Sequence, residues 1–219
     1  MTEGIRVGVI GMGNVGPAIA SALRASGAQI VGVSARSETS QDHAEAMLPG
    51  VPILGEDEVA KGAELLFLAV PDDQIETLTQ GLVDRGSVKP GTVIAHLAGV
   101  HGTEPLRAAA KIGAIPIALH PAMTFSGTSL DVQSLQGAPI AYTCSPLAAP
   151  LALALIENLG GTAFSVGEAD RPLYHAALSH GANHLVTLLT QAQSALEAAG
   201  VEDPAGTLGP LVQVATRRA

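Results

Sequence analysis

One short segment indicates the fold of this chain: Ile5-Arg6-Val7-Gly8-Val9-Ile10-Gly11-Met12-Gly13-Asn14-Val15-Gly16. A strand-like apolar run ends in glycines spaced Gly-x-Gly-x-x-Gly, and an Ala-rich helical stretch, residues 17–25, follows at once. Gly11 permits a tight turn, Gly13 lets the backbone approach a pyrophosphate, and Gly16 lets the helix pack closely on the strand. The helix N-terminus offers free N–H groups and the positive end of its dipole to phosphates. We therefore expect a dinucleotide to bind at Gly11, Met12, Gly13, Asn14, Val15 and Gly16; a purely structural glycine turn is the alternative.

The second predicted strand indicates which dinucleotide fits. In this arrangement an Asp or Glu about twenty residues after the glycines binds the ribose 2′-OH of NAD, whereas an Arg accommodates the 2′-phosphate of NADP. Strand residues 29–33 lead into Ser34-Ala35-Arg36-Ser37, with no acid at the tip. Arg36 carries a planar, permanently charged fork, and the hydroxyls of Ser34 and Ser37 flank it. We predict NADP as the cofactor; a solvated Arg36 in a polar loop is the alternative.

Composition limits the class of protein. The chain has 219 residues, enough for one dinucleotide fold and a small second unit. Hydrophobic residues make up 47% of the chain and charged residues 14%, which is typical of a well-packed globular protein. A net charge of −9 argues against nucleic acid or an anionic membrane as partner. The single cysteine, Cys144, fits a reducing cytoplasm, and no signal peptide is recognised.

Strand-like and helix-like segments alternate and predict a doubly wound, mostly parallel α/β sheet. The strands are expected at residues 5–10, 29–33, 51–54, 64–70, 92–96, 114–119, 139–143 and 162–165. Pro116 cannot donate to a ladder, which places its strand near a sheet edge. We expect a dinucleotide-binding domain over residues 1–168 and a small all-α domain over residues 169–219.

The C-terminal domain is expected to begin with a long helix, residues 172–199. Residues 172–196 contain no Asp, Glu, Lys or Arg, yet their His, Asn, Ser, Thr and Gln side chains argue against a membrane span and favour burial in protein. Leu208, Leu211, Val212 and Ala215 then recur at helical spacing. Such apolar helices exceed what a small domain hides, so we predict a homodimer through them. A longer natural chain is the alternative cover for the last helix.

Four further motifs follow predicted strands or lie on the long helix. They are Val70-Pro71-Asp72-Asp73-x-Ile75, His96-Leu97-Ala98-Gly99, His120-Pro121-Ala122-Met123-Thr124-Phe125, and Tyr174-His175-Ala176-Ala177 followed by Asn183. With the glycine loop, they resemble the Rossmann-like proteins that carry a C-terminal domain of unknown function, near the ketopantoate reductase, pyrroline-5-carboxylate reductase and beta-hydroxyacid dehydrogenase superfamily. The resemblance covers nearly the whole chain. It implies a Rossmann fold and further cofactor contacts at Val70, Pro71, Asp72, Ile75, Ala98 and Gly99.

The chain departs from this superfamily at two places. Dehydrogenases of the superfamily place a Lys four residues before a helix Asn, whereas Ser179 stands four residues before Asn183 here. Relatives commonly show Ser-Gly where this chain has Ala98-Gly99. The catalytic acid therefore does not transfer from the resemblance.

Candidate catalytic residues come instead from position. His120 stands at the end of a predicted strand, where open sheets bind ligands. His175, Ser179 and Asn183 recur every four residues and share one helical stripe. If that stripe faces the nicotinamide, Asn183 fixes a carbonyl or carboxylate, Ser179 bonds the reacting oxygen, and His175 or His120 shuttles a proton. The structural alternatives are a turn residue at His120 and a hydrogen-bonded core residue at Asn183.

His180 and His184 recur four apart on a neighbouring face of the same helix. We expect them to be hydrogen-bonded core residues. Half of a zinc site is the alternative, but no Cys or carboxylate lies nearby, so we predict no metal site.

Two hypotheses for function remain, from different classes. The first is an NADP-dependent oxidoreductase that transfers hydride to or from a small carboxylate-bearing carbonyl or imine, with a ketopantoate-like 2-oxo acid favoured. The second is a non-catalytic module that senses NADP and docks a protein partner through its helical half. The absent Lys favours the second hypothesis, and the His/Ser/Asn stripe favours the first.

Overall fold

The computed structural model describes residues 4–217, and contacts divide the chain into two compact units that meet between Tyr174 and His175. The first unit is a sheet with helices on both faces, and the second is helical. The predicted fold class, a mostly parallel α/β sheet followed by a helical C-terminal part, is confirmed.

The sheet has the strand order β2-β1-β3-β4-β5-β6-β7. The strand bounds are β1 Arg6–Ile10, β2 Gln29–Ser34, β3 Leu65–Leu68, β4 Val93–His96, β5 Ile115–Pro121, β6 Pro139–Cys144 and β7 Thr162–Ser165. Strands β1 to β5 are parallel, whereas β6 is antiparallel to β5 and β7 is parallel to β6. The carboxyl ends of β1 to β5 therefore share one edge of the sheet, where ligands bind in folds of this class.

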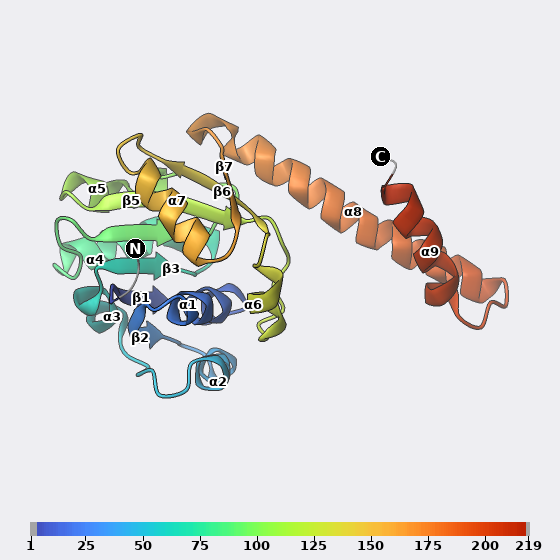
Figure 1. Ribbon diagram of the computed structural model, residues 1–219, viewed down its shortest axis with the longest axis horizontal. Coiled ribbons are helices and arrows are strands. Elements are labelled where there is room, and N and C mark those ends of the chain that lie inside the picture. Colours follow the sequence, from blue (N-terminus) through green and yellow to red (C-terminus); the bar gives the residue numbers. More distant parts are fainter. Residues whose placement is uncertain (1–3, 218–219) are drawn as a thin grey trace. The chain divides into compact units, whose positions relative to one another are not determined.

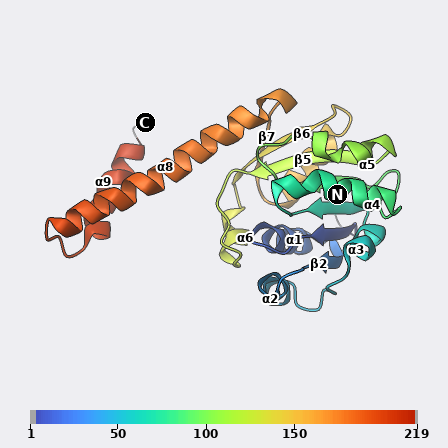
Figure 2. The same ribbon diagram turned by 180° about the vertical axis from the view of Figure 1, so that it is seen from behind.

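Seven α-helices connect the strands of this unit within the described residues. They are α1 Val15–Ala25, α2 Glu38–Met47, α3 Glu56–Gly62, α4 Ile75–Asp84, α5 Arg107–Lys111, α6 Leu130–Ser134 and α7 Ala149–Asn158. Short 3-10 helices lie at Asp72–Gln74, Glu104–Leu106 and Glu168–Asp170. Helices α1 and α7 cover one face of the sheet (Figure 1), and α4 and α5 cover the other (Figure 2).

Alternation along the strands builds a separate core under each face. Val9 and Phe67 pack with α1 and α7 residues such as Ile19 and Leu155. The next residues along the same two strands, Ile10 and Leu68, pack into the second core with residues of α3, α4 and α5. Both faces of these parallel strands are covered, which explains why their sequences are continuous apolar runs.

Two local expectations were wrong. Pro116 lies in β5, which is interior and pairs with β4 and β6. The ladder to β6 starts at Ile117, so the missing N–H of Pro116 leaves no gap in that ladder. Residues 51–54 form no strand, because only Ile53 bridges to β2. Helix α3 was not expected.

The second unit contains most of α8 (Arg171–Ala198), from His175 on, and α9 (Pro204–Thr216). The Asp203 side chain caps α9 by accepting a hydrogen bond from the Gly206 N–H. The long helix, expected to be buried in protein, exposes Leu185, Val186 and Leu188 within the single chain. Across residues 4–217, no helix is long and apolar enough to span a membrane.

Candidate functional site

The glycine loop joins β1 to α1. Gly11 has a φ of 100°, and a side chain there would collide with the carbonyl of Ala69 just after β3. A side chain at Gly16 would strike the carbonyl of Gly11. Gly13, in contrast, has no heavy atom within 4 Å of the place that a Cβ would take. The Asn14 side chain makes no capping bond to α1. The loop therefore has the open backbone and uncapped helix start that suit a phosphate.

A pocket of about 460 Å³ opens beside this loop, at the carboxyl ends of β1, β2 and β3. Eight of the predicted cofactor residues line it: Gly11, Met12, Gly13, Ser34, Arg36, Ser37, Val70 and Pro71. The lining also includes Ile10, Ser40, Glu56, Ala69 and Gln74, which the sequence did not single out.

The other predicted cofactor residues do not line this pocket: Asn14, Val15, Gly16, Asp72, Ile75, Ala98 and Gly99. The Ile75 side chain is fully buried in the second core, and Gly16 packs on Gly11. Asp72 begins the 3-10 helix that follows β3.

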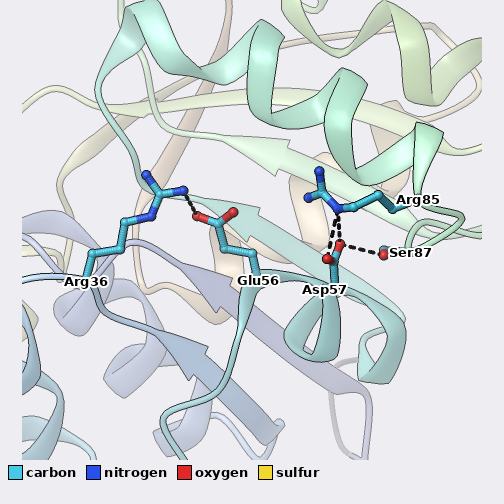
Figure 3. A network of polar contacts seen from close by, with 5 residues as sticks. All are labelled: Arg36, Glu56, Asp57, Arg85 and Ser87. Atoms are coloured by element: carbon cyan, nitrogen blue, oxygen red, sulfur yellow. Dashed lines mark hydrogen bonds and ion pairs between the residues drawn. The ribbon is translucent and has the colours of Figure 1, made fainter.

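Arg36 at the tip of β2 is the cation of the pocket. Its Nη2 lies 2.6 Å from Oε1 of Glu56, the first residue of α3 (Figure 3). The Arg36 side chain is 76% exposed and that of Glu56 only 19%. A second cavity of about 320 Å³ shares Arg36, Glu56 and Gln74 with the first pocket. Arg36 therefore lies where the two cavities meet.

The neighbouring carboxylate holds a different arginine. Asp57 accepts hydrogen bonds from Nε of Arg85 at 2.8 Å and from the Ser87 hydroxyl at 2.7 Å (Figure 3). The Ser87 and Arg85 hydrogen bonds lower the pKa of the Asp57 carboxyl. This network ties the start of α3 to the end of α4.

A second group of polar side chains surrounds the end of β5. Nδ1 of His120 and the hydroxyl of Tyr174 are 2.9 Å apart, and the two rings pack edge to face. Phe164 packs on the other side of the Tyr174 ring. Burial raises the pKa of the Tyr174 hydroxyl. Tyr174 was noted only as part of a motif, so its contact with the candidate His120 is new information from the structure.

Arg171, the first residue of α8, is fully buried beside this pair. Its Nε donates to the Thr143 hydroxyl at 2.8 Å and its Nη2 to the Ala118 carbonyl at 3.0 Å. Its Nη1 is buried without a hydrogen-bond partner, and no carboxylate of residues 4–217 lies within 4 Å of the guanidinium. Burial lowers the pKa of this guanidinium. Sequence analysis missed Arg171, although it is the last cation before the uncharged stretch.

His96 at the end of β4 is also fully buried. Its Nε2 donates to the Gly102 carbonyl at 2.6 Å, while its Nδ1 accepts from the Ala98 N–H at 3.1 Å. Burial lowers the pKa of the ring to about 4, so the imidazole is neutral at physiological pH. His96 shapes the loop that follows β4.

The predicted helical stripe lies in the second unit. Ser179 Oγ is 3.5 Å from Nε2 of His175, so these two residues are neighbours. Asn183 is exposed, and its backbone carbonyl accepts a hydrogen bond from Thr187. His180 and His184 are exposed rather than core residues, and Nδ1 of His184 lies 2.9 Å from the His180 carbonyl. Within residues 4–217, no three His, Cys, Asp or Glu side chains group as metal ligands would.

The chain belongs to the Rossmann-like domain family, which matches residues 2–121. Residues 138–219 match a family described as a domain of unknown function, DUF2520. The predicted resemblance is thus confirmed. No curated protein matches the chain.

Solved structures with the same fold include three with named activities. A proposed NADP oxidoreductase from Bacteroides fragilis aligns with a TM-score of 0.80 and 21% identity, covering 100% of this chain and 81% of that one. Pyrroline carboxylate reductase from Plasmodium falciparum, solved with NADP bound, aligns with a TM-score of 0.68 and 12% identity. The alignment covers 99% of this chain and 79% of that one. Arogenate dehydrogenase from Synechocystis aligns with a TM-score of 0.65 and 22% identity, covering 98% of this chain and 75% of that one.

Proposed function

We propose that the protein is an NADP-dependent oxidoreductase acting on a small carboxylate-bearing carbonyl or imine substrate, with a ketopantoate-like 2-oxo acid favoured. One observation carries the proposal: a single pocket joins the open backbone at Gly13 to the guanidinium of Arg36. The names of the similar structures support it, since they include an NADP-bound reductase and a dehydrogenase.

Different residues of the pocket would bind different parts of the cofactor. Backbone N–H groups at Gly13 and the start of α1 would hold the pyrophosphate. Arg36, with the hydroxyls of Ser34 and Ser37, would hold the 2′-phosphate of the adenosine ribose. Val70 and Pro71 form the wall next to β3. These groups position the cofactor, and the bound nicotinamide supplies the hydride chemistry.

The proton is assigned to His120. A carbonyl oxygen or imine nitrogen that gains a hydride must also gain a proton, and an imidazole is suited to deliver it near neutral pH. Tyr174 orients the His120 ring through the 2.9 Å hydrogen bond. On α8, Asn183 is the candidate for the substrate carboxylate or carbonyl, Ser179 for the reacting oxygen, and His175 is the alternative to His120 for the proton.

The alternative is a module that senses NADP without turnover and docks a protein partner through its helical half. Ser179 favours it, because Ser179 occupies the place where related dehydrogenases carry a Lys. We also propose a homodimer through the C-terminal helices, supported by the exposed Leu185, Val186 and Leu188 on α8. A cytoplasmic location is proposed as well, supported by the single Cys144.

Cofactor binding tests the proposal first. NADPH and NADH are titrated separately by fluorescence and calorimetry, and wild-type protein is expected to bind NADPH more tightly. Arg36→Asp should weaken NADPH far more than NADH, because it removes the 2′-phosphate ligand and adds a negative charge. Arg107→Asp is the matched control, since Arg107 also pairs with carboxylates but lies outside the pocket. Equal losses for both cofactors in Arg36→Asp would refute the 2′-phosphate assignment.

Turnover then separates the two functions. A panel of 2-oxo acids and imines is followed at 340 nm with NADPH. An enzyme oxidises NADPH with at least one of them, whereas a sensor binds NADPH and oxidises it with none.

A further inference from the structure

We propose that Glu56 is a second determinant of cofactor choice: its carboxylate competes with a 2′-phosphate for Arg36 and so narrows the preference for NADPH over NADH. The proposal rests on the proposed function. It starts from the 2.6 Å ion pair between Arg36 and Glu56 inside the pocket (Figure 3).

The carboxylate is the fixed member of this pair. Glu56 is the first residue of α3, and Glu58 secures that helix start by accepting a hydrogen bond from the Gly55 N–H at 3.1 Å. The adjacent Asp57 is bound to Arg85 and Ser87 (Figure 3). The side chain of Glu56 is largely buried, whereas that of Arg36 is mostly exposed. Arg36 can therefore leave Glu56, but Glu56 stays in the pocket wall.

Charge decides what the pair does to each cofactor. A 2′-phosphate that reaches Arg36 meets a guanidinium already neutralised by Glu56, and it is repelled by the carboxylate that remains. In the adjoining cavity, the lining carries Asp73 as well as Arg85, so this second pair of charges balances. A ribose 2′-hydroxyl carries no charge and can donate to a carboxylate, as it does in NAD-binding members of this fold class. Glu56 therefore disfavours NADPH and tolerates or assists NADH.

Glu56→Gln is the direct test. The amide keeps the size of the side chain and removes its charge, so NADPH should bind about three- to tenfold more tightly while NADH does not gain. Glu104→Gln is the matched control: Glu104 also pairs with an arginine, Arg107 at 2.7 Å, and lies outside both cavities. An unchanged ratio of the two dissociation constants in Glu56→Gln overturns the proposal.

A double-mutant cycle shows more directly whether Glu56 changes the ratio of the NADPH and NADH dissociation constants. Arg36→Gln alone leaves an unpaired carboxylate in the pocket, so this variant should bind NADH more tightly than NADPH. The double variant Arg36→Gln/Glu56→Gln carries neither charge, so the ratio of its dissociation constants for NADPH and NADH should return close to one. The same ratio in the single and double variants contradicts a role for Glu56.

Different results would refute the proposed function and the role of Glu56. Should wild-type protein bind neither NADPH nor NADH, the proposed function and this inference both fall. If both cofactors bind but Glu56→Gln does not change the ratio of their dissociation constants, only the role of Glu56 is refuted. If circular dichroism shows Glu56→Gln to be unfolded, Glu56→Ser replaces it with the same expected ratio, because Ser is accepted in the first turn of a helix.

Discussion

The hydroxyl of Tyr174 lies 2.9 Å from Nδ1 of His120 and joins the first turn of α8 to the end of β5. This bond engages one ring nitrogen of the residue to which we assign the proton. It therefore fixes the orientation of the imidazole, and the tautomer of the ring decides which group donates.

Tyr174→Phe removes this bond and keeps the aromatic packing. We expect kcat to fall about tenfold, with a displaced pH profile and an unchanged Kd for NADPH. In His120→Asn, kcat should fall about 10²- to 10⁴-fold. Tyr142→Phe, which removes the other tyrosine hydroxyl of the chain, is the control. A Tyr174→Phe enzyme with wild-type kcat and pH profile would show that the bond is merely structural.

Arg171 gives a prediction about stability. Arg171→Lys should lower the free energy of unfolding by about 3–5 kcal/mol, because a charge stays buried without the fork that reaches Thr143 and Ala118. Arg171→Met should cost less, since it removes the charge and keeps much of the volume. Urea denaturation measures both, with the exposed Arg107→Met as reference. A larger loss in Arg171→Met than in Arg171→Lys contradicts this account.

His96 makes stability depend on pH. Its pKa falls from 6.5 to about 4 on burial, so between these values the unfolded chain binds a proton that the folded chain does not. The free energy of unfolding should therefore decrease as the pH drops through this window, by up to about 3 kcal/mol.

Denaturation curves at a series of pH values test this. His96→Asn should be less stable at pH 7 and should show a shallower dependence on pH in the window. His184→Asn, at an exposed position, should keep the wild-type slope. An unaltered slope in His96→Asn would assign the acid sensitivity to other groups.

Asp131 controls a loop beside the glycine turn. Burial alone would raise the pKa of its carboxyl, but hydrogen bonds from Ser126, Gly127 and Thr128 outweigh burial and lower it. Gly127 lies against Asn14, where a Cβ would stand 3.0 Å from Oδ1. This loop therefore packs next to the proposed phosphate site.

Asp131→Asn places an amide among these N–H donors, so we expect a loss of about 1–3 kcal/mol and weaker NADPH binding. In the wild type, the same stabilisation should disappear as the pH falls below 3.8 and through the folded pKa. Thermal melting and NADPH titration measure the two effects, with Ser134→Ala as the control. A variant that melts and binds as the wild type does would show that the loop needs no carboxylate.

Sequence patterns predicted what local spacing determines. The glycine spacing identified the turn at Gly11, and Arg36 was placed correctly at the tip of β2. Continuous apolar runs predicted the central strands, because both of their faces are covered. Pro116 led to a wrong prediction of a strand near the sheet edge. The pairing of β5 with β6 starts one residue later, at Ile117, so it does not need the N–H that Pro116 lacks.

The features that were missed depend on distant contacts. Glu56 meets Arg36 from a separate helix, and Arg171 meets the carbonyl of Ala118 from far along the chain. No spacing rule encodes such pairs. An acid-rich run, Glu56-Asp57-Glu58, was the available signal for α3, because acids favour the first turn of a helix. Composition alone does not say what covers an apolar helix such as α8.

All the residues that line the larger pocket fall between Ile10 and Gln74. Synthesis proceeds from the N-terminus, so every one of these residues is added to the chain before β4. Strands β1, β2 and β3 are neighbours in the sheet and can pair at that stage. The residues that form this pocket thus precede the later strands, which extend a sheet whose first three strands can already be paired.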